Sequence, residues 1–326
     1  MVYGVFVVTA ALIVIAATQL ARYGDIIAIR TGLGGMFIGV LLLATATSLP
    51  EVLTSISALN QGAPDLAAGN LLGSNTFNML LLAVVDIVGR NQRILRKTAF
   101  KHALTGSLAV VMIGLVVFFV LADIDVMVGW VGGDALLIMA AYVVALRLIQ
   151  SNAAPGLPVA ATSAIPAGTP SLRHGIIGFA VAAGALIVIT PTMVASANEI
   201  AEVTGLGATF IGTALVAMIT SLPELVTTLA ALRIGAADMA IGNLFGSNMF
   251  NMFAVGLTDV FFTQGRFLAV IDPAFLLVGV MGLLMTGMGL IGNLARFDRR
   301  LWVIEMDGLA LIVFYGAGLW LLYARG

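Results

Sequence analysis

One pentapeptide, Thr-Ser-Leu-Pro-Glu, occurs twice in the sequence, at residues 47–51 and 220–224. Both copies lie inside long apolar runs, and each ends on a glutamate that follows a proline. A carboxylate within a hydrophobic segment is costly, so Glu51 and Glu224 indicate a functional site rather than a solvated surface. Any fold for this chain must stabilise both carboxylates, and the repetition predicts that it does so in two equivalent ways.

The composition excludes a water-soluble domain. Of the 326 residues, 61% are hydrophobic and 10% are charged, whereas a soluble domain carries roughly 25% charged residues. Apolar runs separated by short polar clusters are typical of an all-α polytopic membrane protein, with the lipid bilayer as its surroundings. We expect ten transmembrane helices, at residues 3–20, 33–58, 66–88, 102–121, 128–149, 175–194, 206–231, 239–262, 273–292 and 303–323.

The chain consists of two similar halves. An offset of 173 residues (224 − 51) relates the two pentapeptides, and it also maps Gly69-Asn70 onto Gly242-Asn243 and the run 73–75 onto 246–248. We expect residues 1–150 to form a first five-helix repeat and residues 173–326 a second. The Pro-, Ala- and Gly-rich segment 151–172 reads as a linker. Five helices are an odd number, so the second repeat is expected to be inverted in the membrane, as in secondary transporters.

The basic residues give the expected orientation. Lys and Arg gather in alternate loops, and an excess of these residues marks the cytoplasmic side. This places the linker 151–172 in the cytoplasm and both termini outside. The chain has no cysteine, which excludes disulfides and thiolate metal sites. Its net charge of −1 gives no reason to expect a nucleic-acid partner.

The repeated motifs predict a site made of oxygen atoms. A proline removes a backbone donor and disfavours helix before it, so helices 2 and 7 are expected to be discontinuous at Pro50 and Pro223. Thr47 and Ser48 precede Glu51 by four and three residues and therefore share one helix face with it. Two carboxylates, amides and hydroxyls from both halves give a site of charge −2, which suits a hard cation such as Ca²⁺. The candidate side chains are Thr47, Ser48, Glu51, Ser74, Asn78, Thr220, Ser221, Glu224, Ser247 and Asn251.

The motif TSLPE followed by GNxxGSNxFN, present twice, resembles the two alpha repeats of the calcium/cation antiporter superfamily, in its sodium/calcium exchanger branch. The compact chain is similar to prokaryotic members. The resemblance implies that the side chains above line the ion sites, with backbone oxygens from Ala44 and Ala217. It also implies that helices 1 and 6 slide as a gating pair, and that the protein lies in a prokaryotic inner (plasma) membrane.

The resemblance implies a secondary antiporter that exchanges Ca²⁺ for Na⁺, and not an enzyme. It implies no cofactor and no obligate protein partner, with inorganic cations as the transported ligands. Ala46 and Ile219 stand where the family usually has glycine, and Asn78 and Asn251 are both neutral where several relatives carry one aspartate. Two protons would also neutralise two carboxylates, so a Ca²⁺/H⁺ or other divalent cation/H⁺ antiporter is an alternative. A cation channel is a more remote one.

Overall fold

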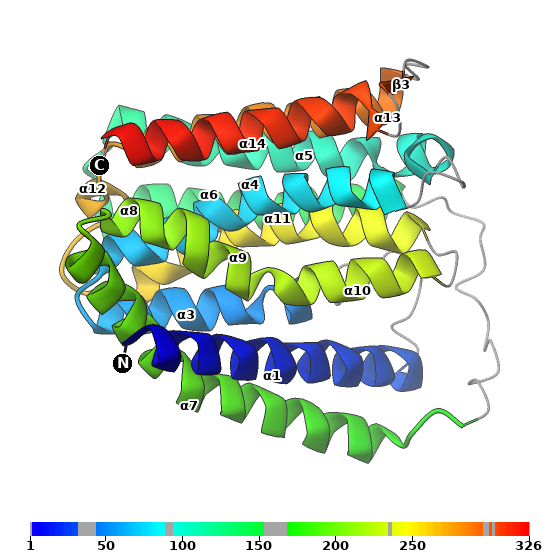
Figure 1. Cartoon of the computed structure of the whole chain (residues 1–326), viewed down its shortest axis with the longest axis horizontal. Helices are drawn as coiled ribbons and strands as arrows, with labels where there is room; N and C mark the ends of the chain where they lie inside the picture. The colour runs from blue at the N-terminus through cyan, green and yellow to red at the C-terminus, as the bar shows by residue number, and fades with distance from the viewer. Residues whose placement is uncertain are drawn as a thin grey trace.

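The computed structural model describes residues 2–31, 44–88, 94–152, 168–233, 237–295, 300–301 and 304–325. The described chain is a predominantly helical bundle, shown in Figure 1. Its helices are α1 (Val2–Thr31), α3 (Leu49–Asn60), α4 (Pro64–Val88), α5 (Ile94–Ala122), α6 (Gly133–Asn152), α7 (Leu172–Thr204), α8 (Ala208–Ile211), η1 (Gly212–Val216, a π-helix), α9 (Ala217–Thr220), α10 (Leu222–Arg233), α11 (Ala237–Phe261), α12 (Phe267–Val270), α13 (Phe275–Ala295) and α14 (Met306–Arg325).

The helices form layers around α4 and α11. These two helices lie in the middle of the bundle, with α1 and α7 side by side along one edge and α5, α13 and α14 along the other (Figure 1). Almost all of α4 is buried, including its polar residues. Polar side chains carried at the centre of an apolar bundle must find partners there, because lipid offers none. The centre of the bundle, around α4 and α11, is therefore where a polar site is expected.

Eight of the described helices are long and apolar enough to cross a membrane. The chain is thus a multi-pass integral membrane protein. The expected spans at 33–58 and 239–262 are not among the eight. Most of the first half of the expected span 33–58 falls on residues 32–43, which lie outside the described part. At the expected span 239–262 the structure has the helix α11, Ala237–Phe261. The total of ten spans stays a prediction.

Two helices are much longer than the sequence predicts. The helix expected at 3–20 runs from Val2 to Thr31, and the helix expected at 175–194 runs from Leu172 to Thr204. A helix of 30 residues is about 45 Å long, against about 30 Å of hydrocarbon. Hydropathy marks only the part within the bilayer, so the polar ends of both helices were wrongly assigned to loops. Pro191 lies inside α7, and the helix continues past it to Thr204.

Short hairpins replace two expected helix ends. Strands β1 (Met127–Val128) and β2 (Val131–Gly132) pair in antiparallel fashion, so α6 begins at Gly133 and not at 128 as predicted. Gly129 in the turn has φ of 67°, a left-handed conformation that glycine adopts without strain. Strands β3 (Arg300–Leu301) and β4 (Ile304–Glu305) form a second hairpin before α14.

The helix interruptions expected at the repeated pentapeptide are present in both halves. Ser48 lies between a helical turn and α3 with φ −89° and ψ 5°, and Ser221 lies between α9 and α10 with φ −88° and ψ 4°. The two breaks therefore have the same backbone geometry. In each case the proline that follows stands in the first turn of the next helix, where its missing N–H is tolerated.

Glycines allow α4 to lie unusually close to the second interrupted helix. A Cβ atom added to Gly69 would approach Gly212 backbone to 2.9 Å, and one added to Gly73 would approach the Thr213 Cα and carbonyl oxygen to 2.8 Å. Such distances leave no room for a side chain. α4 and the second interrupted helix thus meet backbone to backbone, and this contact brings the neighbouring polar residues of α4 next to α9.

An ionic cluster closes the end of the bundle that holds both termini (Figure 1). Arg266, just before α12, forms ion pairs with Asp123, with Asp125 (3.5 Å) and with Asp134 (3.2 Å). The side chains of Arg266 and Asp134 are 6% and 1% exposed. Burial lowers the pKa of Arg266, but the hydrogen bond to Asp123 and the charges of Asp134 and Asp123 outweigh it and raise that pKa. The cluster links the α5–β1 turn to the loop before α13.

Candidate functional site

The two copies of the pentapeptide meet through crossed hydrogen bonds. Ser48 Oγ donates to Glu224 Oε1 at 3.0 Å, and Ser221 Oγ donates to Glu51 Oε1 at 3.0 Å. Each serine thus serves the carboxylate of the other half. Because a serine and a glutamate three residues apart share a helix face, this exchange places the two carboxylates beside each other. All four side chains are fully buried.

The two threonines of the motif hold the breaks in place. Thr47 Oγ1 donates to the carbonyl of Ala44 at 3.1 Å, whereas the Thr220 hydroxyl lies 3.2 Å from the carbonyl of Ala217 and is closer to Asn70 Oδ1. The carbonyls of Ala44 and Ala217 accept the N–H groups of Ser48 (2.9 Å) and Ser221 (3.1 Å). In this conformation the Ala44 carbonyl accepts two hydrogen bonds, so the Thr47 hydroxyl has to turn away before that oxygen can bind an ion.

Asn70 and Asn243 connect each break to the opposite half. Asn70 Nδ2 donates to the carbonyl of Glu51 (2.9 Å), and its Oδ1 accepts from Thr220 (2.8 Å). Asn243 Oδ1 lies 3.4 Å from the Thr47 hydroxyl. We did not predict this role from the sequence, although both residues stand in the repeated GN pair. The only sequence signal was that a polar amide recurs at the same place in both halves.

The asparagines of the second motif form another crossed arrangement. Asn78 Nδ2 donates to Asn248 Oδ1 at 3.0 Å, and Asn251 Nδ2 donates to Asn75 Oδ1 at 3.1 Å. The amide nitrogens of Asn78 and Asn251 are therefore used in hydrogen bonds between α4 and α11. Asn75 and Asn248 are the partners of the two candidate ligands.

Five oxygen atoms of the cluster are left without a hydrogen-bond partner among the described residues. They are Glu51 Oε2, Glu224 Oε2, Asn78 Oδ1, Asn251 Oδ1 and Ser74 Oγ. Each belongs to a side chain with no solvent exposure. Buried polar atoms are normally paired, so such a set requires an explanation such as an ion. Ser247, the counterpart of Ser74, donates weakly to Glu224 at 3.4 Å.

The arrangement suits a hard cation. Carboxylate, amide and hydroxyl oxygens are the ligands that Ca²⁺ takes in groups of six to eight, and Na⁺ accepts the same kind of oxygen. Two neighbouring carboxylates with no exposure repel each other and are poorly solvated, so the cluster is stable only when protons or cations balance its charge. The structure buries all ten candidate side chains, and hydrogen bonds join the serine and the glutamate of one half to those of the other.

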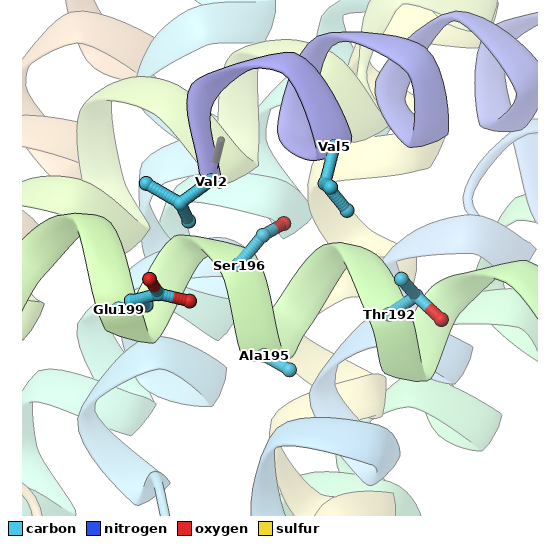
Figure 2. A pocket seen from close by; sticks show the side chains of 6 residues that line it. All are labelled: Val2, Val5, Thr192, Ala195, Ser196 and Glu199. Atoms are coloured by element: carbon cyan, nitrogen blue, oxygen red, sulfur yellow. The ribbon is translucent and has the colours of Figure 1, made fainter.

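The side chains of the cluster have no solvent exposure in the described part of the structure. A cavity of about 200 Å³ lies elsewhere, between the first turn of α1 and the later turns of α7, where Val2 and Val5 face Ser196 (Figure 2). Its other lining residues are Thr192, Ala195 and Glu199. None of them belongs to the oxygen cluster. This cavity is therefore separate from the oxygen cluster.

Several known proteins are similar to this chain. A family model described as sodium/calcium exchanger protein matches residues 1–149 and 174–324. The sodium/calcium exchanger MaX1 of Methanosarcina acetivorans is 26% identical over 339 residues, covering 91% of this chain and 91% of that protein. The solved sodium-calcium exchanger NCX_Mj has a TM-score of 0.62 and 22% identity, covering 98% of each chain. The H⁺/Ca²⁺ exchanger CAX has a TM-score of 0.73 and 12% identity, covering 99% of this chain and 85% of the other. Both structures have the same fold.

Proposed function

Given that the chain belongs to the sodium/calcium exchanger protein family, we propose that it is a secondary antiporter that exchanges Ca²⁺ for Na⁺. The observation that carries the proposal is the set of five unpartnered oxygens, fully buried and drawn from both halves of the chain. Glu51 and Glu224 are the charged ligands. Asn78, Asn251, Ser74, Ser247, Ser48, Ser221, Thr47 and Thr220 supply neutral oxygens, and Ala44 and Ala217 supply backbone oxygens, that of Ala44 after Thr47 turns.

Charge balance makes the exchange obligatory. One Ca²⁺ balances the charge of the two carboxylates, and two Na⁺ balance it equally well. Ca²⁺ and Na⁺ would bind to the same oxygens. They therefore compete for the site. When it is empty, two adjacent carboxylates would have to be enclosed without compensation, which is strongly unfavourable. The site therefore switches from facing one side of the membrane to facing the other only when cations are bound. This requirement couples the transport of one ion to that of the other.

We further propose ten transmembrane helices in two inverted repeats, residues 1–150 and 173–326, joined by a cytoplasmic linker at 151–172. The matching breaks at Ser48 and Ser221, the crossed hydrogen bonds and the two termini at one end of the bundle support this plan (Figure 1). The clustering of Lys and Arg supports termini outside, in a prokaryotic inner membrane.

The chain contains no cysteine, so a single introduced thiol reports the side on which a loop lies. We expect Ser163→Cys, in the linker, to react with a membrane-impermeant maleimide only after the inner face of the membrane is opened. Asp125→Cys, beside β1, is expected to react in intact cells. Labelling of both thiols from the same side would contradict the proposed orientation.

The movement that opens the site is proposed to involve α1 and α7. These helices lie together at one edge of the bundle rather than among the central helices (Figure 1). Gln61, at the end of α3, donates through Nε2 to the carbonyl of Pro191 in α7 at 3.1 Å. This contact is one of those that must break when α7 slides past α3. The edge position of α1 and α7 supports the proposal that these two helices are the ones that move.

A Ca²⁺/H⁺ antiporter is the second candidate. The structural similarity to the H⁺/Ca²⁺ exchanger CAX, with a TM-score of 0.73, is one reason to consider this candidate. Because Asn78 and Asn251 are both neutral, the cluster carries two carboxylates, and two protons would discharge them as completely as one Ca²⁺. The two candidates differ only in the ion that replaces Ca²⁺. They are therefore distinguished by which ion gradient drives Ca²⁺ transport.

In proteoliposomes, we expect an imposed Na⁺ gradient to drive Ca²⁺ uptake, and a pH gradient alone to drive none. Each gradient is applied with and without an ionophore that dissipates it, and liposomes without protein give the background. Uptake driven by the pH gradient alone would replace Na⁺ by H⁺ as the counter-ion. Ca²⁺ movement that needs neither gradient would instead indicate a channel.

A further inference from the structure

The two crossed asparagine pairs are anchored differently. Asn248 Nδ2 donates to Thr286 Oγ1 on α13 at 3.3 Å and to the carbonyl of Asn75 at 3.3 Å. Thr286 has no solvent exposure. In the other half, Asn75 Nδ2 is buried and has no partner among the described residues. The same amide position is thus fixed in one half and unfixed in the other.

The sequence explains the difference. The 173-residue offset that relates the halves maps Thr286 back to Ile113, on α5. A Cβ atom added to Gly282 would lie 3.8 Å from Asn75 Cβ and 4.0 Å from Ile113 Cγ2, so both side chains border the same spot. The isoleucine offers methyl groups where threonine offers a hydroxyl, and Asn75 Nδ2 has no partner among the described residues.

The orientation of an amide decides what its neighbour presents. An asparagine side chain has one acceptor oxygen and one donor nitrogen, and a rotation by 180° exchanges them. With its nitrogen directed to Thr286 and to the Asn75 carbonyl, Asn248 must direct Oδ1 to Asn78. Asn78 then gives its nitrogen to Asn248 and keeps Oδ1 unpaired in the cluster. A rotation of Asn248 would turn a donor nitrogen of Asn78 toward the cation.

We propose that Thr286 is a positioning residue that fixes Asn248, and through it the ligand oxygen of Asn78. Ile113 leaves Asn75 unfixed, so the oxygen of Asn251 is the less firmly oriented of the two. The two halves of the site are therefore unequal, with one rigid amide ligand and one adaptable amide ligand. This inference rests on the proposed cation site.

Four variants test the assignment. Thr286→Val removes the acceptor at nearly constant volume, Thr286→Ser keeps it, and Ile113→Thr adds one beside Asn75. Thr258→Val is the matched control, because Thr258 is a fully buried threonine of α11 whose hydroxyl donates to the carbonyl of Val255 at 2.7 Å. Ca²⁺ affinity is measured on purified protein by calorimetry, and the half-saturating Ca²⁺ concentration and the maximal rate are measured in proteoliposomes.

We expect Thr286→Val to weaken Ca²⁺ binding about tenfold, which is the effect of roughly one lost net hydrogen bond. Its maximal rate is expected to stay within about twofold of the wild type, because the charged ligands are intact. Thr286→Ser and Thr258→Val are expected to bind as the wild type does. Ile113→Thr is expected to tighten binding by about twofold to fivefold, because it fixes the second amide.

Unchanged affinity in Thr286→Val would overturn the positioning role while leaving the proposed function intact. An equal loss in Thr286→Ser would also overturn it, because the packing and not the hydroxyl would then matter. Weaker binding in Ile113→Thr would overturn the inequality of the halves. A wild-type protein that binds neither Ca²⁺ nor Na⁺ would overturn the proposed function, and this inference with it.

Discussion

Glu51→Gln and Glu224→Gln are each expected to abolish Ca²⁺ transport. Either change leaves a single negative charge to balance a divalent ion in a fully buried site. Removal of one charged partner from a buried pair costs about 2–5 kcal/mol, which corresponds to roughly 30-fold to 4,000-fold weaker binding. The measurement is Ca²⁺ flux in proteoliposomes, together with Ca²⁺ affinity on purified protein.

The same variants are expected to remain folded. In the absence of cations, the wild-type cluster encloses two repelling carboxylates, and glutamine removes one of them. The melting temperature of either variant without Ca²⁺ should therefore equal or exceed that of the wild type, and Ca²⁺ should no longer raise it. Glu199→Gln is the control, since this exposed carboxylate lies at the cavity between α1 and α7 and not in the cluster (Figure 2). Near wild-type flux in either site variant would refute the assignment of the carboxylates.

Arg266→Met is expected to destabilise the protein by about 3–5 kcal/mol, because it leaves a buried carboxylate without its counter-charge. Asp134 is the residue affected: its side chain is 1% exposed and lies 3.2 Å from the guanidinium. The change is measured as a lower melting temperature in detergent. It should leave Ca²⁺ affinity unaffected at temperatures where the variant is folded, because Arg266 contacts no residue of the oxygen cluster.

A second substitution separates charge from packing. Asp134→Asn in the Arg266→Met background removes the unpaired charge and keeps an oxygen for the N–H of Ala135, which Asp134 Oδ1 accepts at 2.8 Å. We expect the double variant to recover most of the lost stability. Asp125→Asn alone is the control, with an expected effect of about 0–1 kcal/mol for its largely exposed ion pair. A double variant as unstable as Arg266→Met would show that the loss comes from packing.

The sequence alone predicted the candidate side chains and the positions of both helix breaks. Proline at residues 50 and 223 has a direct local effect on backbone geometry, and the internal repeat identified the residues that must lie together. Helix ends were predicted poorly, because hydropathy reports the thickness of the bilayer and not the length of the helix. That is why α1 was expected to end at residue 20 and continues to Thr31.

The contacts that orient the candidate ligands could not be predicted. The partners of Asn78 and Glu51 are Asn248 and Ser221, each 170 residues away in the chain. Thr286 lies outside both repeated motifs, on a helix that shows only an apolar pattern. Such partners follow from how α4, α11 and α13 pack, and no local pattern in the sequence reports that packing.

The crossed serine hydrogen bonds also bear on how such a chain can arise and diversify. Ser48 serves Glu224 and Ser221 serves Glu51, so a gene for one half would encode a carboxylate without its hydroxyl donor. A polypeptide of one half would therefore need a second copy of itself to complete either carboxylate. In the full chain, a change at one serine acts on a glutamate that lies more than 150 residues away. Neither copy of the pentapeptide can thus be altered without an effect on the other.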